Sequence, residues 1–219
     1  MEIRLENVNL TLDKNEILKE INLSLEGGHI YGLVGRNGCG KSMLLKTICG
    51  FIPPTSGKVF VNQVDLYETH TFPQNTRALL DKPEYINELT GYENLELLAS
   101  ILHKDYKTMI LEALQKVNLS EEKNKKFGKY SLGMKQKLGI AQVIMENPDI
   151  MIFDEPFNGL EEESANKIRE LLKEYKSSGK LIIIATHIRE DIDSLCDVIY
   201  RMDAGKIVND NCQQKKVDR

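Results

Sequence analysis

The sequence predicts an α/β protein with a mostly parallel core sheet, an antiparallel β flank at the N-terminus and an inserted helical subdomain. Three observations support this fold class. Residues 3–12 and 21–25 alternate polar and apolar side chains, as half-buried antiparallel strands do. Between 87 and 147 the apolar residues keep helical spacing instead. Three short apolar runs, typical of fully buried strands, lie at 30–34, 150–153 and 181–185.

The first third of the chain reads as strands followed by one helix. The turn Asp13-Lys14-Asn15 joins the two alternating strands. The apolar run 30–34 leads into a glycine-rich loop and a helix over 41–49, which Gly50 ends. After a Pro-Pro turn comes one more short strand at 58–62, and a loop-rich stretch then extends to Leu80.

The later part of the chain predicts parallel strands. The apolar runs 150–153 and 181–185 flank a charged helical segment at 161–175, which is a βαβ pattern. Parallel sheets of this kind bind ligands outside the carboxyl ends of their strands. The residues that follow each apolar run are therefore the candidates for a functional site.

Composition and charge argue against several protein classes. With a net charge of −4, the mixed charges offer no electrostatic footprint for nucleic acid or for an anionic membrane. No apolar run approaches the roughly 20 residues of a membrane helix. The N-terminus lacks the apolar segment of a signal peptide, so we expect a cytoplasmic protein. The four cysteines have neither disulfide nor metal-ligand spacing, and we expect free thiols.

A glycine-rich loop follows the first buried run. Its sequence, Gly-Arg-Asn-Gly-Cys-Gly-Lys-Ser, has the spacing of a phosphate-binding loop between a strand and a helix. This context favours a P-loop NTPase core that binds ATP and Mg²⁺ over a glycine turn without a ligand. The residues expected to contact ATP are Gly35, Asn37, Gly38, Cys39, Gly40, Lys41, Ser42 and Met43. Lys41 would reach the terminal phosphates, and the Ser42 hydroxyl would bind Mg²⁺.

Polar residues also follow the other two apolar runs. Asp154 suits a carboxylate that holds hydrated Mg²⁺, and Glu155 suits a base that polarises the water attacking the γ-phosphate. Taken alone, this acidic pair before Pro156 is equally typical of a loop start. His187 follows an entirely apolar strand, which favours a role beside the γ-phosphate over a packing role. We predict Glu155 and His187 as the catalytic residues.

The order of motifs resembles the nucleotide-binding subunit of ABC transporters over essentially the whole chain. Tyr130-Ser131-Leu132-Gly133-Met134-Lys135-Gln136 is similar to the signature motif of that family. The resemblance implies a head-to-tail dimer in which Ser131 and Gly133 of one copy face the P-loop of the other. On the residues alone, an ordinary helix N-cap is the favoured interpretation of Ser131. The segment 158–161 resembles the D-loop, and His187 matches the switch histidine.

Besides Leu132 and Met134 in the signature-like motif and Glu161 in the D-loop-like segment, two departures from the family pattern affect what the resemblance implies for nucleotide and metal binding. The aromatic residue that stacks on adenine aligns with Leu12, which offers only apolar contact. The glutamine that links Mg²⁺ to the membrane partner aligns with Asp81, which accepts hydrogen bonds but does not donate them. The resemblance thus implies a metal site made of Ser42, Asp81 and Asp154.

The resemblance implies a single ABC ATPase domain with a nucleotide-binding core of 1–81 and 147–219 and a helical subdomain of 82–146. Such a protein hydrolyses ATP to power a separate transmembrane permease subunit, here expected to export a drug, antibiotic or peptide. It would lie on the inner face of the cell membrane as a homodimer or paired with a similar subunit. The alternatives are a small-molecule P-loop kinase and a soluble ABC protein without a transport role.

Two further hypotheses concern single side chains. Cys39 is either a reactive thiol that ATP shields or an inert small residue, and burial favours the second. Tyr85 and Ile86 follow Asp81 in a turn-rich segment. They either dock the membrane subunit or pack under the helical insert.

Overall fold

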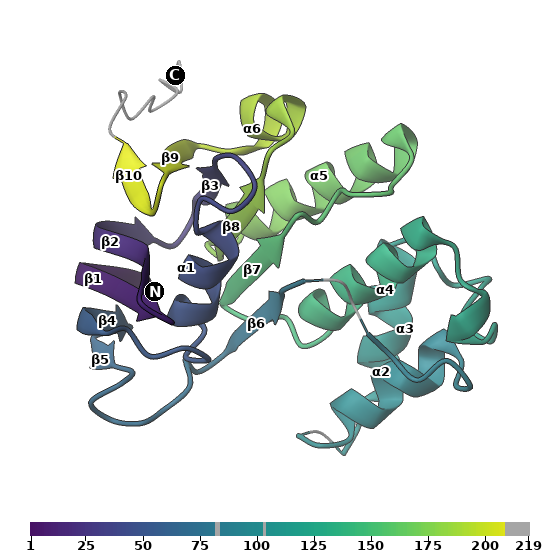
Figure 1. Cartoon of the computed structure of the whole chain (residues 1–219). Helices are drawn as coiled ribbons and strands as arrows, with labels where there is room; N and C mark the ends of the chain where they lie inside the picture. The colour runs from purple at the N-terminus through teal and green to yellow at the C-terminus, as the bar shows by residue number, and fades with distance from the viewer. Residues whose placement is uncertain (82–83, 103, 209–219) are drawn as a thin grey trace.

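The computed structural model describes residues 1–81, 84–102 and 104–208, and these form two β-sheets with helices around them (Figure 1). The strands are β1 (Glu2–Leu12), β2 (Asn15–Glu26), β3 (Ile30–Val34), β4 (Ser56–Val61), β5 (Val64–Asp65), β6 (Thr76–Leu79), β7 (Ile150–Asp154), β8 (Leu181–Thr186), β9 (Val198–Asp203) and β10 (Lys206–Val208). The helices are α1 (Lys41–Ile48), α2 (Gly91–Ala99), α3 (Lys107–Lys116), the 3₁₀ helix η1 (Phe127–Lys129), α4 (Leu132–Ile144), α5 (Glu162–Ser177) and α6 (Arg189–Leu195).

The larger sheet has the strand order β10-β9-β3-β8-β7-β6. The pairs of β3 with β8 and β9, of β7 with β8 and of β6 with β7 are parallel, and only β9 and β10 pair antiparallel. Because β3, β8 and β7 are neighbours that run in the same direction, their carboxyl ends lie at one edge of the sheet. The βαβ connection through α5, predicted from the sequence, is confirmed.

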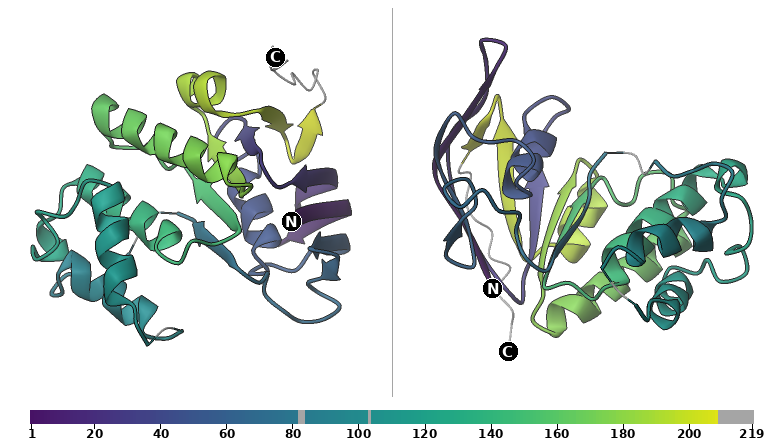
Figure 2. Two further views of the ribbon diagram at one scale, coloured as in Figure 1. Left: turned by 180° about the vertical axis from the view of Figure 1, so that it is seen from behind. Right: turned by 90° about the horizontal axis from the view of Figure 1, so that it is seen from below.

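The smaller sheet is the antiparallel flank expected at the N-terminus, with the order β2-β1-β4-β5. Helix α1 lies between this sheet and the larger one (Figure 2). The second strand begins at Asn15 rather than at Ile21. Register shifts in its pairing with β1 interrupt the alternation of side chains, which is why the sequence pattern showed only part of the strand.

The larger sheet is buried on both faces because its strands alternate between two hydrophobic clusters. On β8, Leu181 and Ile183 pack with α1 and the antiparallel sheet, whereas Ile182 and Ile184 pack with α4 and α5. All four side chains are fully buried. This two-sided burial explains the continuous apolar runs in the sequence. It also fixes the sheet edge at which the polar strand ends meet.

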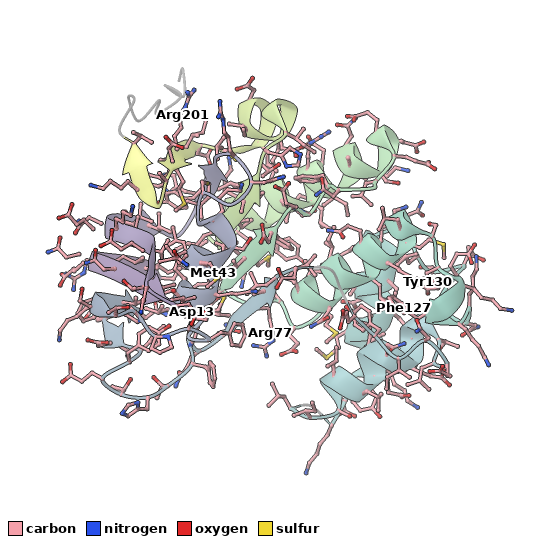
Figure 3. All side chains as sticks on the ribbon, viewed as in Figure 1. Asp13, Met43, Arg77, Phe127, Tyr130 and Arg201 are labelled. Carbon is pink, nitrogen blue, oxygen red and sulfur yellow. The ribbon has the colours of Figure 1, made fainter. Side chains whose placement is uncertain are left out.

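The helices α2, α3 and α4 form the inserted helical part, beyond β6 (Figure 1). Phe127 and Tyr130, labelled in Figure 3, contact each other in its core. Tyr85 packs edge-on against Phe127, and its hydroxyl donates to Oε1 of Gln142 at 2.5 Å. Tyr85 therefore packs under the helical insert, as the packing interpretation expected. Ile86 is 49% exposed.

Three details differ from the sequence-based expectation. The stretch expected to be loop before Leu80 contains β6, a short strand at the edge of the sheet. Helix α2 ends at Ala99, so Leu102 lies outside it and is 66% exposed. Strands β9 and β10 complete the sheet near the C-terminus, where the sequence showed no strong apolar run. Within the described ranges, none of the helices combines the length and apolar character of a membrane span.

Candidate functional site

Three polar segments meet at the carboxyl ends of adjacent parallel strands. β3 leads into the glycine-rich loop, β7 ends in Asp154 with Glu155 next, and β8 ends in Thr186 with His187 next. The strand order β3-β8-β7 brings these ends together. This is the edge at which parallel α/β sheets bind their ligands.

The glycine-rich loop is shaped by residues with positive φ. Gly38 and Gly40 have φ of 80° and 111°, a region that side chains disfavour. Gly40 is also the N-cap of α1, and no side chain in the described ranges caps that helix. The first-turn amides of α1 therefore point to an open position where an anion binds well. The ammonium group of Lys41 is held in the loop, where it donates to the carbonyl oxygen of Gly35 at 2.7 Å.

The hydroxyl of Ser42, at the start of α1, donates to Oδ2 of Asp154 at 2.5 Å. Burial raises the pKa of Asp154, and the nearby charges of Glu155 and Asp81 raise it further, while the bond from Ser42 and the charge of Lys41 oppose them. The charge of Lys41 therefore offsets only part of the cost of burying this carboxylate beside two other acidic groups. A cation bound beside Ser42 and Asp154 would supply further positive charge, and oxygen ligands of this kind suit Mg²⁺.

Glu155 and His187 form the second contact of the site. Nδ1 of His187 lies 2.7 Å from Oε1 of Glu155. Glu155 has a φ of 49°, and its backbone N–H donates to the carbonyl oxygen of Ala185 at 2.8 Å. Among the described residues, nothing forms a hydrogen bond with the buried Oε2 of Glu155. This free carboxylate oxygen is suited to accept a proton from water.

These groups surround one cavity of about 560 Å³. It lies between the loop, the start of α1, the ends of the strands and the start of α4. The residues that line it are Ile17, Asn37, Gly38, Gly40, Lys41, Ser42, Met43, Asp81, Leu132, Gln136, Asp154, Glu155 and Asn158.

Most of the predicted site residues line this cavity, but five do not. Gly35 and Cys39 lie behind the loop, where the buried Cys39 thiol fills the space next to Gly35. His187 reaches the site through Glu155. Ser131 and Gly133 do not line the cavity of their own chain.

Four residues that line the cavity were not among the predicted site residues: Ile17, Leu132, Gln136 and Asn158. Ile17 on β2 lines the cavity in place of Leu12, which is 39% exposed and is not among the lining residues. Gln136 on α4 is buried, and its side-chain amide donates to the carbonyl oxygen of Glu155 at 3.2 Å. Gln136 was visible as the last residue of the signature-like motif, whereas no sequence signal distinguished Ile17.

The signature-like motif forms the start of α4. Ser131 is the N-cap, and its hydroxyl accepts from the backbone N–H of Met134 at 3.3 Å. Gly133 packs against the segment after Glu155, because a Cβ at this position would lie 2.8 Å from the carbonyl oxygen of Gly159. The motif thus touches the D-loop-like segment of its own chain.

Asp81 forms an ion pair with Lys46 of α1, with Oδ2 and Nζ 2.7 Å apart. Its backbone has a φ of 60°, and its side chain is 61% exposed. In the described part of the chain, no three His, Cys, Asp or Glu side chains are grouped to hold a metal ion by themselves.

Comparisons with known proteins agree on one family. A family model described as ABC transporter matches residues 18–158. The bacitracin transport ATP-binding protein BcrA of Enterococcus faecalis is 39% identical over 96% of this chain and 70% of its own length. The lantibiotic transport ATP-binding protein SrtF of Streptococcus pyogenes is 31% identical over 94% of this chain and 89% of its own length. A solved ATP-binding cassette, dimeric and bound to ADP and Pi in a post-hydrolysis state, superposes with a TM-score of 0.84. It is 25% identical and covers 94% of this chain and 96% of its own.

Proposed function

This chain belongs to the ABC transporter family of ATP-binding proteins, and we propose that its strand-end cavity binds Mg²⁺-ATP and hydrolyses it to drive a membrane permease. The observation that carries the proposal is the convergence of two polar contacts on one cavity. Ser42 with Asp154, at 2.5 Å, provides the metal-binding side, and His187 with Glu155, at 2.7 Å, provides the hydrolytic side.

The loop and the start of α1 hold the phosphates. The amides of Gly38 and Gly40 and the helix N-terminus bind their negative charge, with Asn37 and Met43 around them, while the Cys39 thiol packs behind the loop. Lys41 leaves the carbonyl of Gly35 to bind the terminal phosphates. Bound Mg²⁺ neutralises phosphate charge, and we assign its protein ligands to Ser42 and Asp154, with Asp81 at the edge of this set.

Hydrolysis depends on Glu155 and His187. The unpaired Oε2 of Glu155 accepts a proton from the attacking water, while His187 holds the other oxygen and faces the γ-phosphate. With water as the attacking group, the products are ADP and inorganic phosphate.

A complete site takes two chains. Ser131 and Gly133 do not line the cavity of their own chain, and Ser131 is exposed. We infer that they close over the nucleotide of a second copy or of a paired ABC subunit. The dimeric state of the similar solved cassette supports this arrangement.

The proposed function divides the chain into a nucleotide-binding part and a helical part. We propose one ABC ATPase domain, with a nucleotide-binding core in 1–81 and 147–219 and a helical subdomain in 82–146. The membrane permease is a separate subunit that keeps this chain at the inner face of the cell membrane. The names of the bacitracin and lantibiotic relatives support an antibiotic or peptide as the exported cargo.

One set of measurements tests the function. The purified chain should release phosphate from ATP in the presence of Mg²⁺ without any acceptor. The substitution Glu155→Gln should retain ATP binding, lower phosphate release by at least about 100-fold, and trap an ATP-bound dimer on size-exclusion chromatography. Phosphorylation of an added metabolite, or normal hydrolysis by Glu155→Gln, would contradict the proposal.

A further inference from the structure

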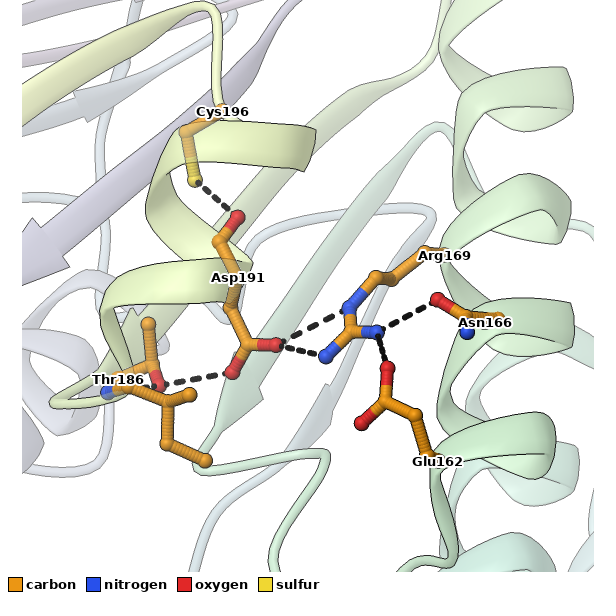
Figure 4. A network of polar contacts seen from close by, with 7 residues as sticks. Glu162, Asn166, Arg169, Thr186, Asp191 and Cys196 are labelled. Carbon is orange, nitrogen blue, oxygen red and sulfur yellow. Dashed lines mark hydrogen bonds and ion pairs between the residues drawn. The ribbon is translucent and has the colours of Figure 1, made fainter.

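A buried ion pair lies behind the candidate site (Figure 4). Arg169 of α5 is 6% exposed and Asp191 of α6 is fully buried. Nε and Nη2 of Arg169 both donate to Oδ1 of Asp191, at 3.1 and 2.7 Å. The remaining nitrogen, Nη1, donates to Asn166 at 2.7 Å and to Glu162 at 2.9 Å. The guanidinium group is therefore fixed in one orientation by several bonds at once.

One side of this pair holds the segment that carries His187. The second oxygen of Asp191 accepts from the hydroxyl of Thr186 at 3.2 Å. The same hydroxyl accepts from the backbone N–H of Ile188 at 3.1 Å. Thr186 and Ile188 are the residues on either side of His187. These two bonds therefore fix the backbone from which the imidazole reaches Glu155.

The other side of the pair touches the segment that carries Glu155. The guanidinium carbon of Arg169 lies 5.1 Å from the ring centre of Phe157, a cation–π distance. Phe157 is 4% exposed and lies two residues after Glu155. Arg169 thus contacts the Glu155 segment directly and reaches the His187 segment through Asp191 and Thr186.

We propose that Arg169 and Asp191 are positioning residues. They hold the Glu155 and His187 segments in fixed positions relative to each other for hydrolysis. The inference rests on the proposed roles of those two residues. Neither Arg169 nor Asp191 lines the cavity, so neither touches the nucleotide in the same chain. Arg169 and Asp191 affect the positions of Glu155 and His187 through their contacts with Phe157 and Thr186.

The effect of replacing the ion pair distinguishes a positioning role from a role in fold stability alone. A buried ion pair is often replaceable by apolar residues of similar size without loss of stability, although removal of one partner is costly. A pair that only stabilised the fold would therefore be dispensable for turnover when both partners are replaced. A pair that positions two segments would not be.

The most direct test is at Thr186. Thr186→Val keeps the shape of the side chain but removes the hydroxyl that links Asp191 to Ile188. We expect kcat for ATP to fall by about 10- to 100-fold while KM and the Kd for ATP stay within about 2-fold, since small displacements of reacting groups have effects of this size. Thr186→Ser restores the hydroxyl and should recover most of kcat.

The double variant Arg169→Met, Asp191→Leu tests the pair itself. Its melting temperature should stay close to that of the wild type, with ATP still bound and kcat reduced as in Thr186→Val. Lys173→Met, on the same helix and on the solvent side, is the matched control and should leave kcat unchanged. If the double variant does not fold, the Thr186 series decides the question alone.

Glu155→Gln is measured in the same assay to separate the positioning role of Arg169 and Asp191 from the proposed hydrolysis of ATP. If Glu155→Gln loses hydrolysis but folded Thr186→Val keeps a normal kcat, the positioning role is refuted and the proposed function stands. If Glu155→Gln hydrolyses ATP normally, the proposed function itself fails.

Discussion

Nδ1 of His187 lies 2.7 Å from Oε1 of Glu155, and the contact joins the ends of two adjacent parallel strands, β8 and β7. It leaves Oε2 of Glu155 buried and, among the described residues, without a hydrogen-bond partner. One oxygen of the carboxylate is thus held while the other is free. Glu155 lines the cavity, so this carboxylate borders the space that a ligand would occupy.

The contact predicts the effect of removing the imidazole. His187→Ala should lower kcat for ATP by about 100-fold or more, with a smaller change in KM, because the base loses its orienting partner. Steady-state phosphate release measures both constants. His29→Ala is the control, since His29 precedes β3 at the opposite end of that strand. A normal kcat in His187→Ala would exclude His187 from the mechanism.

The setting of Asp154 predicts a trade between stability and metal binding. Its pKa is raised, so the charged carboxylate costs stability at neutral pH, and that cost disappears as the pH falls and the group is protonated. Asp154→Asn should raise the melting temperature of the nucleotide-free chain at pH 7, and the difference should narrow toward pH 4.5.

The same variant should need at least about 10-fold more Mg²⁺ to bind ATP, because a neutral amide is a weaker Mg²⁺ ligand than a carboxylate. Titration of nucleotide binding with Mg²⁺ measures this directly. Asp149→Asn, at the start of β7, is the matched control for metal binding. Unchanged Mg²⁺ dependence in Asp154→Asn would remove Asp154 from the metal site.

The close packing of Gly133 predicts that even a methyl group is harmful there. Alanine gains at most about 1 kcal/mol of helix propensity over glycine. A Cβ 2.8 Å from the Gly159 carbonyl must displace backbone, at a cost of about 1–3 kcal/mol. Gly133→Ala should therefore lower the melting temperature and ATPase activity, whereas Lys137→Ala on the same helix should not. An alanine variant as active and stable as the wild type would show that the backbone at Gly159 moves away from the added methyl group without cost.

The place of Ile17 in the cavity predicts weak selectivity for the base. Among the described residues, no aromatic side chain lines the cavity, so stacking worth about 1–3 kcal/mol per base is missing there. ATP and GTP should bind with Kd values within about 10-fold of each other. Ile17→Ala should weaken both, and Leu12→Ala should weaken neither. Strong preference for ATP, or sensitivity to Leu12→Ala alone, would restore Leu12 as the base-contacting residue.

The buried cysteines predict low thiol reactivity in the folded chain. Burial raises the pKa of Cys49 to about 12, and Cys39 is 6% exposed. At pH 7.5 maleimide should modify neither residue until the chain is denatured, with or without ATP, as mass spectrometry of tryptic peptides would measure. Rapid labelling of Cys39 that ATP prevents would instead support the reactive thiol. Cys212 lies outside the described residues.

Much of the fold was predictable because burial on both faces leaves a strong sequence pattern. The apolar runs before Asp154 and His187 identified β7 and β8, and glycine spacing identified the loop between β3 and α1. Strand β6 was not predictable, since a four-residue edge strand has few apolar positions. The bounds of β2 were missed because bulges interrupt its alternation.

By itself, the sequence determined which residue types end each buried strand and hence which groups are available for chemistry, because local spacing encodes loops and strands. The tertiary structure decided which of these groups touch. The fold paired His187 with Glu155 and Ser42 with Asp154. The fold also brought Ile17 rather than Leu12 to the cavity. It also placed Arg169 and Asp191 behind both catalytic segments. Such contacts depend on packing between distant segments, and no local pattern in the chain records them.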